Sequence, residues 1–310
     1  MLDMPTNDAV AYVNRGAVLV GQGLFWTGAR RDVDTIAAIG AQEETMRIGK
    51  TLTMMLTLLA LTAPPVSRTQ SGTDQEAKNA QEARQALDRM VQALGGQAWF
   101  DVKNQMREGY IAAFFHNQPN PGTTQFWEYH QWPDHDRVEL TKHRDVVQFI
   151  IGREGWEVTF RGKKAMEKDS LDDFLRRRDH SIETIVKVWL KDPKTILLYE
   201  GQRMASRHMA EQVTLISPQN EAVTILIDTS SHLPLRRSFE WRDPVYKDKN
   251  LDAEEYDNYH TVDGLPTPLS ITRYKNNEMV RQYYVSKVVF NQELQADFWD
   301  VNGAAKRIKK

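Results

Sequence analysis

The sequence predicts a mainly β protein of the α+β class, with one strongly curved antiparallel sheet forming a half-open barrel and helices over its concave face. Three observations lead to this prediction. Roughly ten segments between residues 103 and 290 alternate apolar and polar side chains with a period of two. Most of these segments are joined by short turns, as antiparallel neighbours are. Only two long segments have helical periodicity, too few for the crossovers of a parallel sheet.

The N-terminal part of the chain has the composition of a targeting sequence. Residues 46–71 contain Arg47 and Lys50, then an uncharged run and then small residues, which is the layout of a secretory signal peptide. The uncharged run is shorter than the roughly 20 apolar residues that span a membrane. A buried core helix of the same composition is the alternative. Residues 1–45 are interpreted as a leader produced by a start of translation that is too early, or else as a genuine N-terminal extension.

The bulk composition is that of an ordinary globular protein. The 310 residues are 41% hydrophobic and 26% charged, with a net charge of −2, which gives no long-range attraction for nucleic acid. The chain has no cysteine, so it forms no disulfide, thiolate metal site or cysteine nucleophile. No cysteine follows the signal that could be lipid-modified. We therefore expect a periplasmic or secreted protein that begins between Pro64 and Asp74.

The folded domain is predicted to span residues 73–303. It opens with a helix capped at Thr73, which presents one apolar face and ends at Gly95–Gly96. A second helix is predicted over 170–190, with Ser170 as its N-cap. The basic residues 304–310 are expected to be a solvated tail.

The strands fill the remainder of the domain. Turns are predicted at Ser217–Asn220, Asp263–Gly264 and Asn276–Asn277. Several strands are apolar on both faces, so something must cover the second face. Helices lying in the mouth of such a sheet would make a container for apolar cargo.

Residues with catalytic or metal-binding chemistry are scattered. The cluster Pro133–Arg137 holds His135 between two aspartates, but adjacent side chains on a strand point apart, and a solvated turn is the preferred interpretation over a metal site. The acids and bases of Asp172–His180 are explained by surface pairs on a helix. No hydrolase, zinc-protease, Walker or dinucleotide motif is present. We therefore predict that the protein is not an enzyme and uses no cofactor and no metal.

Three segments resemble one protein family. Ile227–Trp241, which contains IDTSSHLP, resembles the Asp-Thr-x-Leu-Pro-Arg turn of periplasmic lipoprotein carriers of the LolA/LolB-like superfamily and their outer-membrane lipoprotein-sorting relatives. Tyr256–Tyr274, with its Val-Asp-Gly, is similar to the segment that follows in those proteins. Ala93–Gly109 is similar to the way in which many such domains begin. The charged helix and WPDHDR match no motif of these carriers.

The resemblance implies a non-catalytic protein that binds lipid or lipoprotein acyl chains between sheet and helices, with transient membrane contact and a possible protein partner in the cell envelope. An envelope scaffold that binds a protein through the apolar face is an alternative, and a hydrolase built on His135 is a weaker one. The side chains expected to line the apolar cavity are Trp127, Tyr129, Phe149, Ile151, Trp156, Val158 and Phe160.

Overall fold

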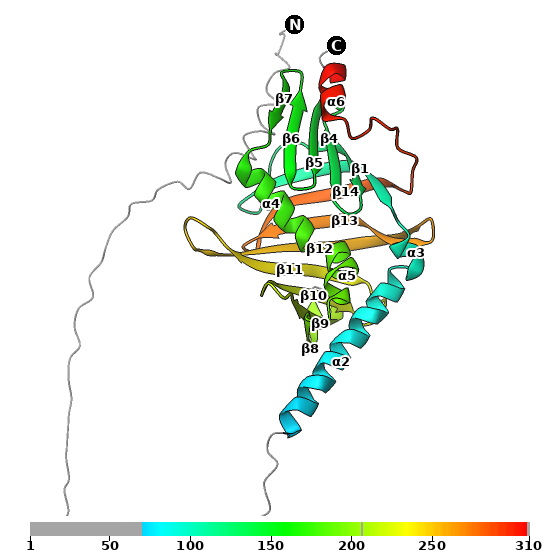
Figure 1. The fold of residues 1–310 in the computed structure, drawn as a ribbon, viewed down its shortest axis with the longest axis vertical. Helices are drawn as coiled ribbons and strands as arrows, with labels where there is room; N and C mark the ends of the chain where they lie inside the picture. Colours follow the sequence, from blue (N-terminus) through cyan, green and yellow to red (C-terminus); the bar gives the residue numbers. More distant parts are fainter. Residues whose placement is uncertain (1–69, 206, 309–310) are drawn as a thin grey trace, which may run out of the picture. The chain divides into compact units, whose positions relative to one another are not determined.

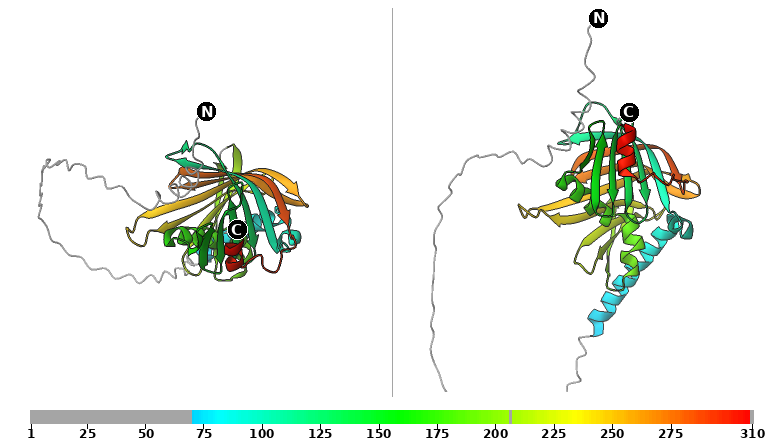
Figure 2. Two further views of the ribbon diagram at one scale, coloured as in Figure 1. Left: turned by 90° about the horizontal axis from the view of Figure 1, so that it is seen from above. Right: turned by 45° about the horizontal axis from the view of Figure 1, so that its top comes forward.

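The computed structural model describes residues 70–205 and 207–308, which form one open antiparallel sheet with helices on both of its sides (Figure 1). The predicted leader and signal peptide lie outside the described residues, apart from Gln70 and Ser71 at the start of the first helix. The views in Figure 2 show the curvature of the sheet. The predicted fold class is therefore confirmed.

The sheet has fourteen strands where the sequence indicated about ten, because several of them are short. Their bounds are β1 Asn104–Phe115, β2 Gln118–Pro119, β3 Thr124–Gln131, β4 His135–Leu140, β5 Val146–Ile151, β6 Glu154–Thr159, β7 Gly162–Ala165, β8 Ile196–Ala205, β9 His208–Ile216, β10 Ala222–Asp228, β11 Pro234–Arg242, β12 Lys249–Val262, β13 Leu265–Lys275 and β14 Glu278–Phe290.

The strand order consists of two meanders that meet in the middle of the sheet. It runs β7-β6-β5-β4-β3-β1-β14-β13-β12-β11-β10-β9-β8, and β2 pairs with β1 outside this path. The meanders join where β1 pairs with β14, with a register shift at Glu108/Gly109. A Cβ on Gly109 would lie 2.0 Å from the carbonyl oxygen of Tyr284, so the close approach of the two backbones requires glycine there.

Two helical regions cover the concave face. The first is α2, which ends before the predicted glycine pair: the Gly96 N–H donates to Val91 O, and Gly95 and Gly96 both have positive φ. The second predicted helix is broken in two, because the Ser181 hydroxyl accepts from the Thr184 N–H and starts a new helix. The bounds are α2 Gln70–Ala93, α3 Gln97–Phe100, α4 Lys168–Asp179, α5 Ile182–Lys187, a 3-10 turn η1 Trp189–Lys191, and α6 Val301–Ile308.

The main core lies where α2, α5 and η1 pack on β8–β11. The apolar stripe predicted for the first helix faces this core, together with aliphatic residues from the sheet. Each fully buried aliphatic side chain contributes roughly 1.5–3 kcal/mol. The core residues with no exposed surface are Ala83, Ala86, Leu87, Met90, Ile185, Val213, Leu215, Val223, Ile225 and Ile227.

A smaller core lies on the opposite face of the sheet, under α6. Val301 and Ala304 of this helix pack on Val147, Phe149 and Val158. Residues 304–308, expected to belong to a solvated tail, are thus part of a helix with a buried apolar side. Lys306 and Arg307 are adjacent and its apolar residues are few, which masked the helical stripe in the sequence.

The predicted turns occupy their expected places. Asp263 and Gly264, with φ of 49° and 82°, connect β12 to β13, and Asn276 and Asn277 connect β13 to β14. Both turns need positive φ, which Asp, Asn and Gly tolerate best. Asp228 accepts from the N–H groups of Ser230 and Ser231, so the DTSS motif serves as the turn between β10 and β11.

Candidate functional site

A cavity of about 260 Å³ lies between the concave face and the α4–α5 region, beside the main core. Its walls come from β1, β3, β4 and β11–β14 of the sheet and from α3, α4 and α5. One part of the wall is apolar and is formed largely by a hydrophobic cluster on β3, β13 and β14. Its apolar members include Phe126, Ile182, Ile271, Tyr283, Val285 and Phe290.

The alternation along β3 decides which side chains reach the cavity. Phe126, Glu128 and His130 face it, whereas Trp127 and Tyr129 point to the other side of the sheet. Pairing with β4 places Asp136 beside His130 on the cavity side. Neighbouring residues of one strand therefore have different surroundings.

None of the seven predicted lining residues borders this cavity. Trp127 is buried on the convex side, with the guanidinium carbon of Arg144 3.9 Å from its ring centroid. The Tyr129 ring packs against Phe298 with 4.8 Å between centroids. Tyr129 also borders a second, more open hollow of about 520 Å³, whose rim is mainly charged. Burial, more than its charged neighbours, raises the pKa of Tyr129.

The other five predicted residues lie on strands β5 and β6 or just beyond. Phe149 and Val158 are fully buried beneath α6, and Ile151 and Trp156 pack against the same cluster. Phe160 is 62% exposed. The structure thus brings Phe149, Ile151, Trp156 and Val158 together as core beneath α6, on the face away from the large cavity.

A row of charged side chains crosses three strands inside the cavity. Arg237 on β11, Glu254 on β12 and Arg273 on β13 are paired across the sheet. Arg237 Nη2 lies 2.8 Å from Glu254 Oε2, and Arg273 Nε lies 2.8 Å from Glu254 Oε1. The Tyr256 hydroxyl donates to the same carboxylate at 3.0 Å. Two arginines therefore share a single glutamate.

These groups stay charged although they are buried. Burial alone would raise the pKa of Glu254, but Arg237 and Arg273 outweigh it and hold that pKa well below its usual range. Burial would lower the pKa of Arg237, and the charge of Glu254 raises it instead. Arg273 Nη1 also donates to the Tyr283 hydroxyl at 2.8 Å.

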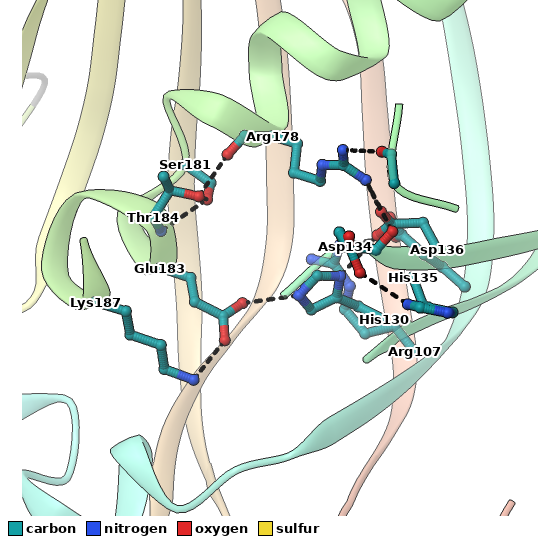
Figure 3. A network of polar contacts seen from close by, with 12 residues as sticks. Arg107, His130, Asp134, His135, Asp136, Arg178, Ser181, Glu183, Thr184 and Lys187 are labelled. Carbon is teal, nitrogen blue, oxygen red and sulfur yellow. Dashed lines mark hydrogen bonds and ion pairs between the residues drawn. The ribbon is translucent and has the colours of Figure 1, made fainter. Parts of the chain in front are cut away.

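A second polar network connects the sheet to the helices (Figure 3). His130 Nδ1 lies 2.7 Å from Asp136 Oδ1, and His130 Nε2 lies 3.1 Å from Glu183 Oε2 on α5. Glu183 also pairs with Lys187 at 2.7 Å. Burial would lower the pKa of His130, but hydrogen bonds to Asp136 and Glu183 prevail and raise it to about 10. His130 is therefore a cation at neutral pH and holds α5 to β3 and β4.

The arginines of α4 make the predicted pairs along the helix, and two of them, Arg176 and Arg178, also make tertiary contacts. The Arg176 guanidinium carbon lies 3.5 Å from the ring centroid of Trp241. Arg177 pairs with Asp173. Arg178 donates to Asp136 Oδ2 at 3.1 Å and to the Gly152 carbonyl. The pairs four residues apart were predicted correctly, but the arginines are not at the surface, because the same side chains also pack against the sheet.

The cluster Pro133–Arg137 divides between the two faces of the sheet. Asp136 belongs to the cavity, whereas His135 lies on the other face, with its ring 5.3 Å from that of Trp299. Among residues 70–205 and 207–308, the only hydrogen-bond partner of the His135 side chain is Asp134, at 2.9 Å. In the same residues, no group of three or more His, Cys, Asp or Glu side chains is arranged to hold a metal ion.

Sequence reasoning did not assign the charged cavity residues to the site. Arg237 is two and four residues before Phe239 and Trp241 on its strand, and Arg273 is two residues after Ile271. Charged residues in phase with buried aromatic or aliphatic residues were the available signal, because side chains two apart on a strand share one face. That phase places these arginines on the concave side.

Comparison with known proteins gives matches in structure but not in sequence. No family model matches the chain, and no curated protein matches it. A DUF1329 family protein from Desulfovibrio piger ATCC 29098 superposes with a TM-score of 0.50 at 11% identity, covering 71% of this chain and 97% of its own.

Two further solved structures are similar over comparable lengths. A putative outer membrane lipoprotein-sorting protein domain from Vibrio parahaemolyticus has a TM-score of 0.45 at 10% identity, covering 74% of this chain and 99% of its own. A LolA superfamily protein from Nitrosomonas europaea has a TM-score of 0.44 at 12% identity, covering 70% and 96%. The chain therefore shares the fold of the Desulfovibrio piger protein over 71% of its length.

Proposed function

We propose that this protein is a non-catalytic carrier that holds an apolar or amphiphilic ligand, a lipid or the acyl chain of a lipoprotein, in the cavity beneath α4 and α5. The observation that carries the proposal is the cavity itself. It is walled on one side by Phe126, Ile271 and Val285 and is bordered by a helical segment held to the sheet by polar contacts. The resemblance of the sequence motifs to lipoprotein carriers favours the same ligand class.

The size of the cavity fits a short length of chain. At about 260 Å³ it lies just below the 300–1,000 Å³ range of small-molecule pockets. A chain with about eight buried methylenes would gain about 6 kcal/mol at 0.8 kcal/mol each. Association costs of about 4 kcal/mol or more offset much of this gain, which leaves weak, reversible binding suited to a carrier. A larger lipid would require α4 and α5 to move outwards.

We further propose that the protein works in the cell envelope. The signal-like segment 46–71 supports export. Among the described residues, no helix is both long enough and apolar enough to cross a membrane. N-terminal sequencing of the protein from cells tests this proposal: a start between Pro64 and Asp74 agrees with export, and a start at Met1 contradicts it.

Filling the cavity tests the carrier proposal. Val285 and Val288 lie on the same strand and in the same cluster, and both are 7–8% exposed, but only Val285 lines the cavity. We expect Val285→Trp to weaken uptake of a fluorescent acyl-chain probe at least about tenfold, because the indole occupies the space of the chain. Val288→Trp is the matched control and should leave uptake unchanged.

The unfolding midpoint of both variants shows whether the fold survives. A lipid found by native mass spectrometry in the wild type, and lost in Val285→Trp, would add direct support. Wild-type protein that is folded, carries no lipid and takes up no probe contradicts the proposal.

Binding of a protein partner is the second candidate function, and one observation favours it. β8 ends the strand order of the described sheet, and Ile196 and Leu198 on it are 54% and 38% exposed. An edge of this kind can pair with a strand of another chain. A polypeptide that copurifies without lipid, and that is lost in Leu198→Lys, would favour this candidate.

A further inference from the structure

We propose that the cavity selects amphiphiles with an anionic headgroup, a phosphate or a carboxylate, which binds against Arg237 and Arg273. This inference rests on the proposed carrier function and narrows its ligand class. It follows from the balance of charge on the cavity wall, from an unused donor and from the apolar row beside them.

The Arg237–Glu254–Arg273 row has one more cation than anion. Arg237 is 1% exposed, and both arginines line the cavity. A buried charge without a partner is strongly unfavourable, and Glu254 can neutralise only one of the two. A bound anion would supply the missing charge.

Arg237 also has a donor to spare. Its Nη1 donates to the His180 carbonyl at 2.9 Å, and its Nη2 pairs with Glu254. Its Nε is buried and has no hydrogen-bond partner among the described residues. A buried donor without an acceptor is unfavourable, and more so on a charged group, so a ligand oxygen that accepts from it is favoured.

The other charged residues of the wall do not remove the excess. Arg107 pairs with Glu128 at 2.7 Å, and Arg177 pairs with Asp173, so each of these pairs is neutral.

The network on β3, β4 and the helices adds to the excess. It consists of three cations (Arg178, His130, Lys187) with only two anions (Asp136, Glu183). The cavity is therefore positive although the whole chain has a net charge of −2.

The apolar wall begins directly beside the charged row. Tyr256, Ile271 and Tyr283 are paired across β12, β13 and β14, two residues along from Glu254 and Arg273 on the same face. A headgroup at the arginines would place an attached chain along this second row. The two rows thus match the two parts of an anionic amphiphile.

Two probes with the same chain separate the headgroup from the tail. Full-length protein stripped of lipid is titrated with dodecyl phosphate, with dodecanol and with inorganic phosphate. Binding is followed by tryptophan fluorescence, to which Trp99 and Trp132 of the cavity wall contribute. We expect dodecyl phosphate to bind about tenfold more tightly than dodecanol or better. Raising the salt from about 0.05 M to about 0.5 M should weaken the binding of dodecyl phosphate only.

Substitution of each arginine tests whether these two side chains cause the preference for dodecyl phosphate over dodecanol. In Arg237→Met and in Arg273→Met, Glu254 keeps the other arginine as its partner, so no lone anion remains. Each should reduce the preference for dodecyl phosphate about fivefold or more. Arg236→Met is the matched control: Arg236 is the neighbour of Arg237 on β11 and pairs with Glu255, next to Glu254, but it does not line the cavity. Circular dichroism checks the fold of each variant.

The outcomes separate this inference from the carrier proposal. Equal binding of dodecyl phosphate and dodecanol by the wild type overturns the anionic headgroup and leaves the carrier proposal standing. Inorganic phosphate that binds as tightly as dodecyl phosphate, with no binding of dodecanol, supports the anion site and overturns the carrier proposal. Failure to bind any probe overturns both. The salt dependence of the wild type decides the matter if both arginine variants misfold.

Discussion

The two halves of the concave face are built from the same kind of strand but are filled differently. Over β8–β11 the face is covered by α2, α5 and η1, and the space between is closed by aliphatic side chains with little or no exposed surface. Over β1, β3 and β12–β14 the face carries Glu254, Arg273 and a cavity, and Arg237 reaches into this half from the neighbouring strand β11. The first half is built for stability, and the second retains polar groups and empty space that a purely structural core would exclude.

This difference has an energetic meaning. A buried ion pair stabilises the fold little more than apolar residues of the same volume would, and it often stabilises the fold less. A domain that has one well-packed half can tolerate a second half whose composition serves another purpose. Stability and binding should therefore respond to substitutions in different places.

The largest expected effect comes from deleting side chains in the packed half. Ile225 is fully buried in the main core, whereas Ile271, at 5% exposure, borders the cavity. We expect Ile225→Ala to lower the free energy of unfolding by about 4 kcal/mol and Ile271→Ala by about 2 kcal/mol, because the wall residue loses fewer contacts. Denaturant titrations measure both values. Equal losses would mean that the two halves are equally well packed.

The second expected effect is on the pH dependence of stability, where the change per pH unit is smaller. The pKa of His130 is raised to about 10, above the 6.5 of an unfolded chain. Its contribution is thus fully present below pH 6.5 and is lost as the pH rises towards 10. The free energy of unfolding should fall over this window by at most about 1.4 kcal/mol per pH unit.

Substitution of His130 isolates this contribution. His130→Gln should reduce the slope between pH 7 and 10. His116, whose side chain is 68% exposed, provides the control, and His116→Gln should keep the wild-type slope. The same slope in His130→Gln and in the wild type would contradict the role of this network.

The smallest expected effect concerns the break between α4 and α5. Ser181→Ala removes the acceptor for the Thr184 N–H and should cost about 1 kcal/mol. Ser170, the N-cap predicted from the sequence, lies inside α4, so Ser170→Ala should change stability by less than about 0.5 kcal/mol. Hydrogen exchange should show faster exchange of the α5 amides in Ser181→Ala only. Faster exchange in both variants would show that the whole segment opens together.

The sequence was informative where local chemistry decides the structure. The turns at Asp263–Gly264 and Asn276–Asn277 need positive φ and therefore have a compositional signature. The glycine pair after α2 marks the end of that helix for the same reason. Such signals determined the antiparallel class and much of the element order.

The sequence alone did not show which side chains of a strand face the concave side of the sheet. On β3, Phe126 and Trp127 are both buried, at 1% and 5%, so alternation does not show which of them faces the helices. Which of the two faces is covered by which helix depends on α6. This helix covers the face that carries Phe149 and lies more than one hundred residues away from it in the chain. Arg237, Glu254 and Arg273 likewise meet only through strand pairing. Long-range register, not local propensity, assembles the site.

The pairing of β1 with β14 has a consequence for the order in which the chain folds. These strands are central neighbours in the sheet, yet they begin and end the strand sequence, with Gln105 opposite Phe290. Each meander can form its own hairpins, but the middle of the sheet is completed only when the last strand is available. Contacts of such wide separation form slowly because of the entropy of closing the loop between them. The middle of the sheet therefore remains open until β14 has been synthesised, long after the first strands can form their hairpins.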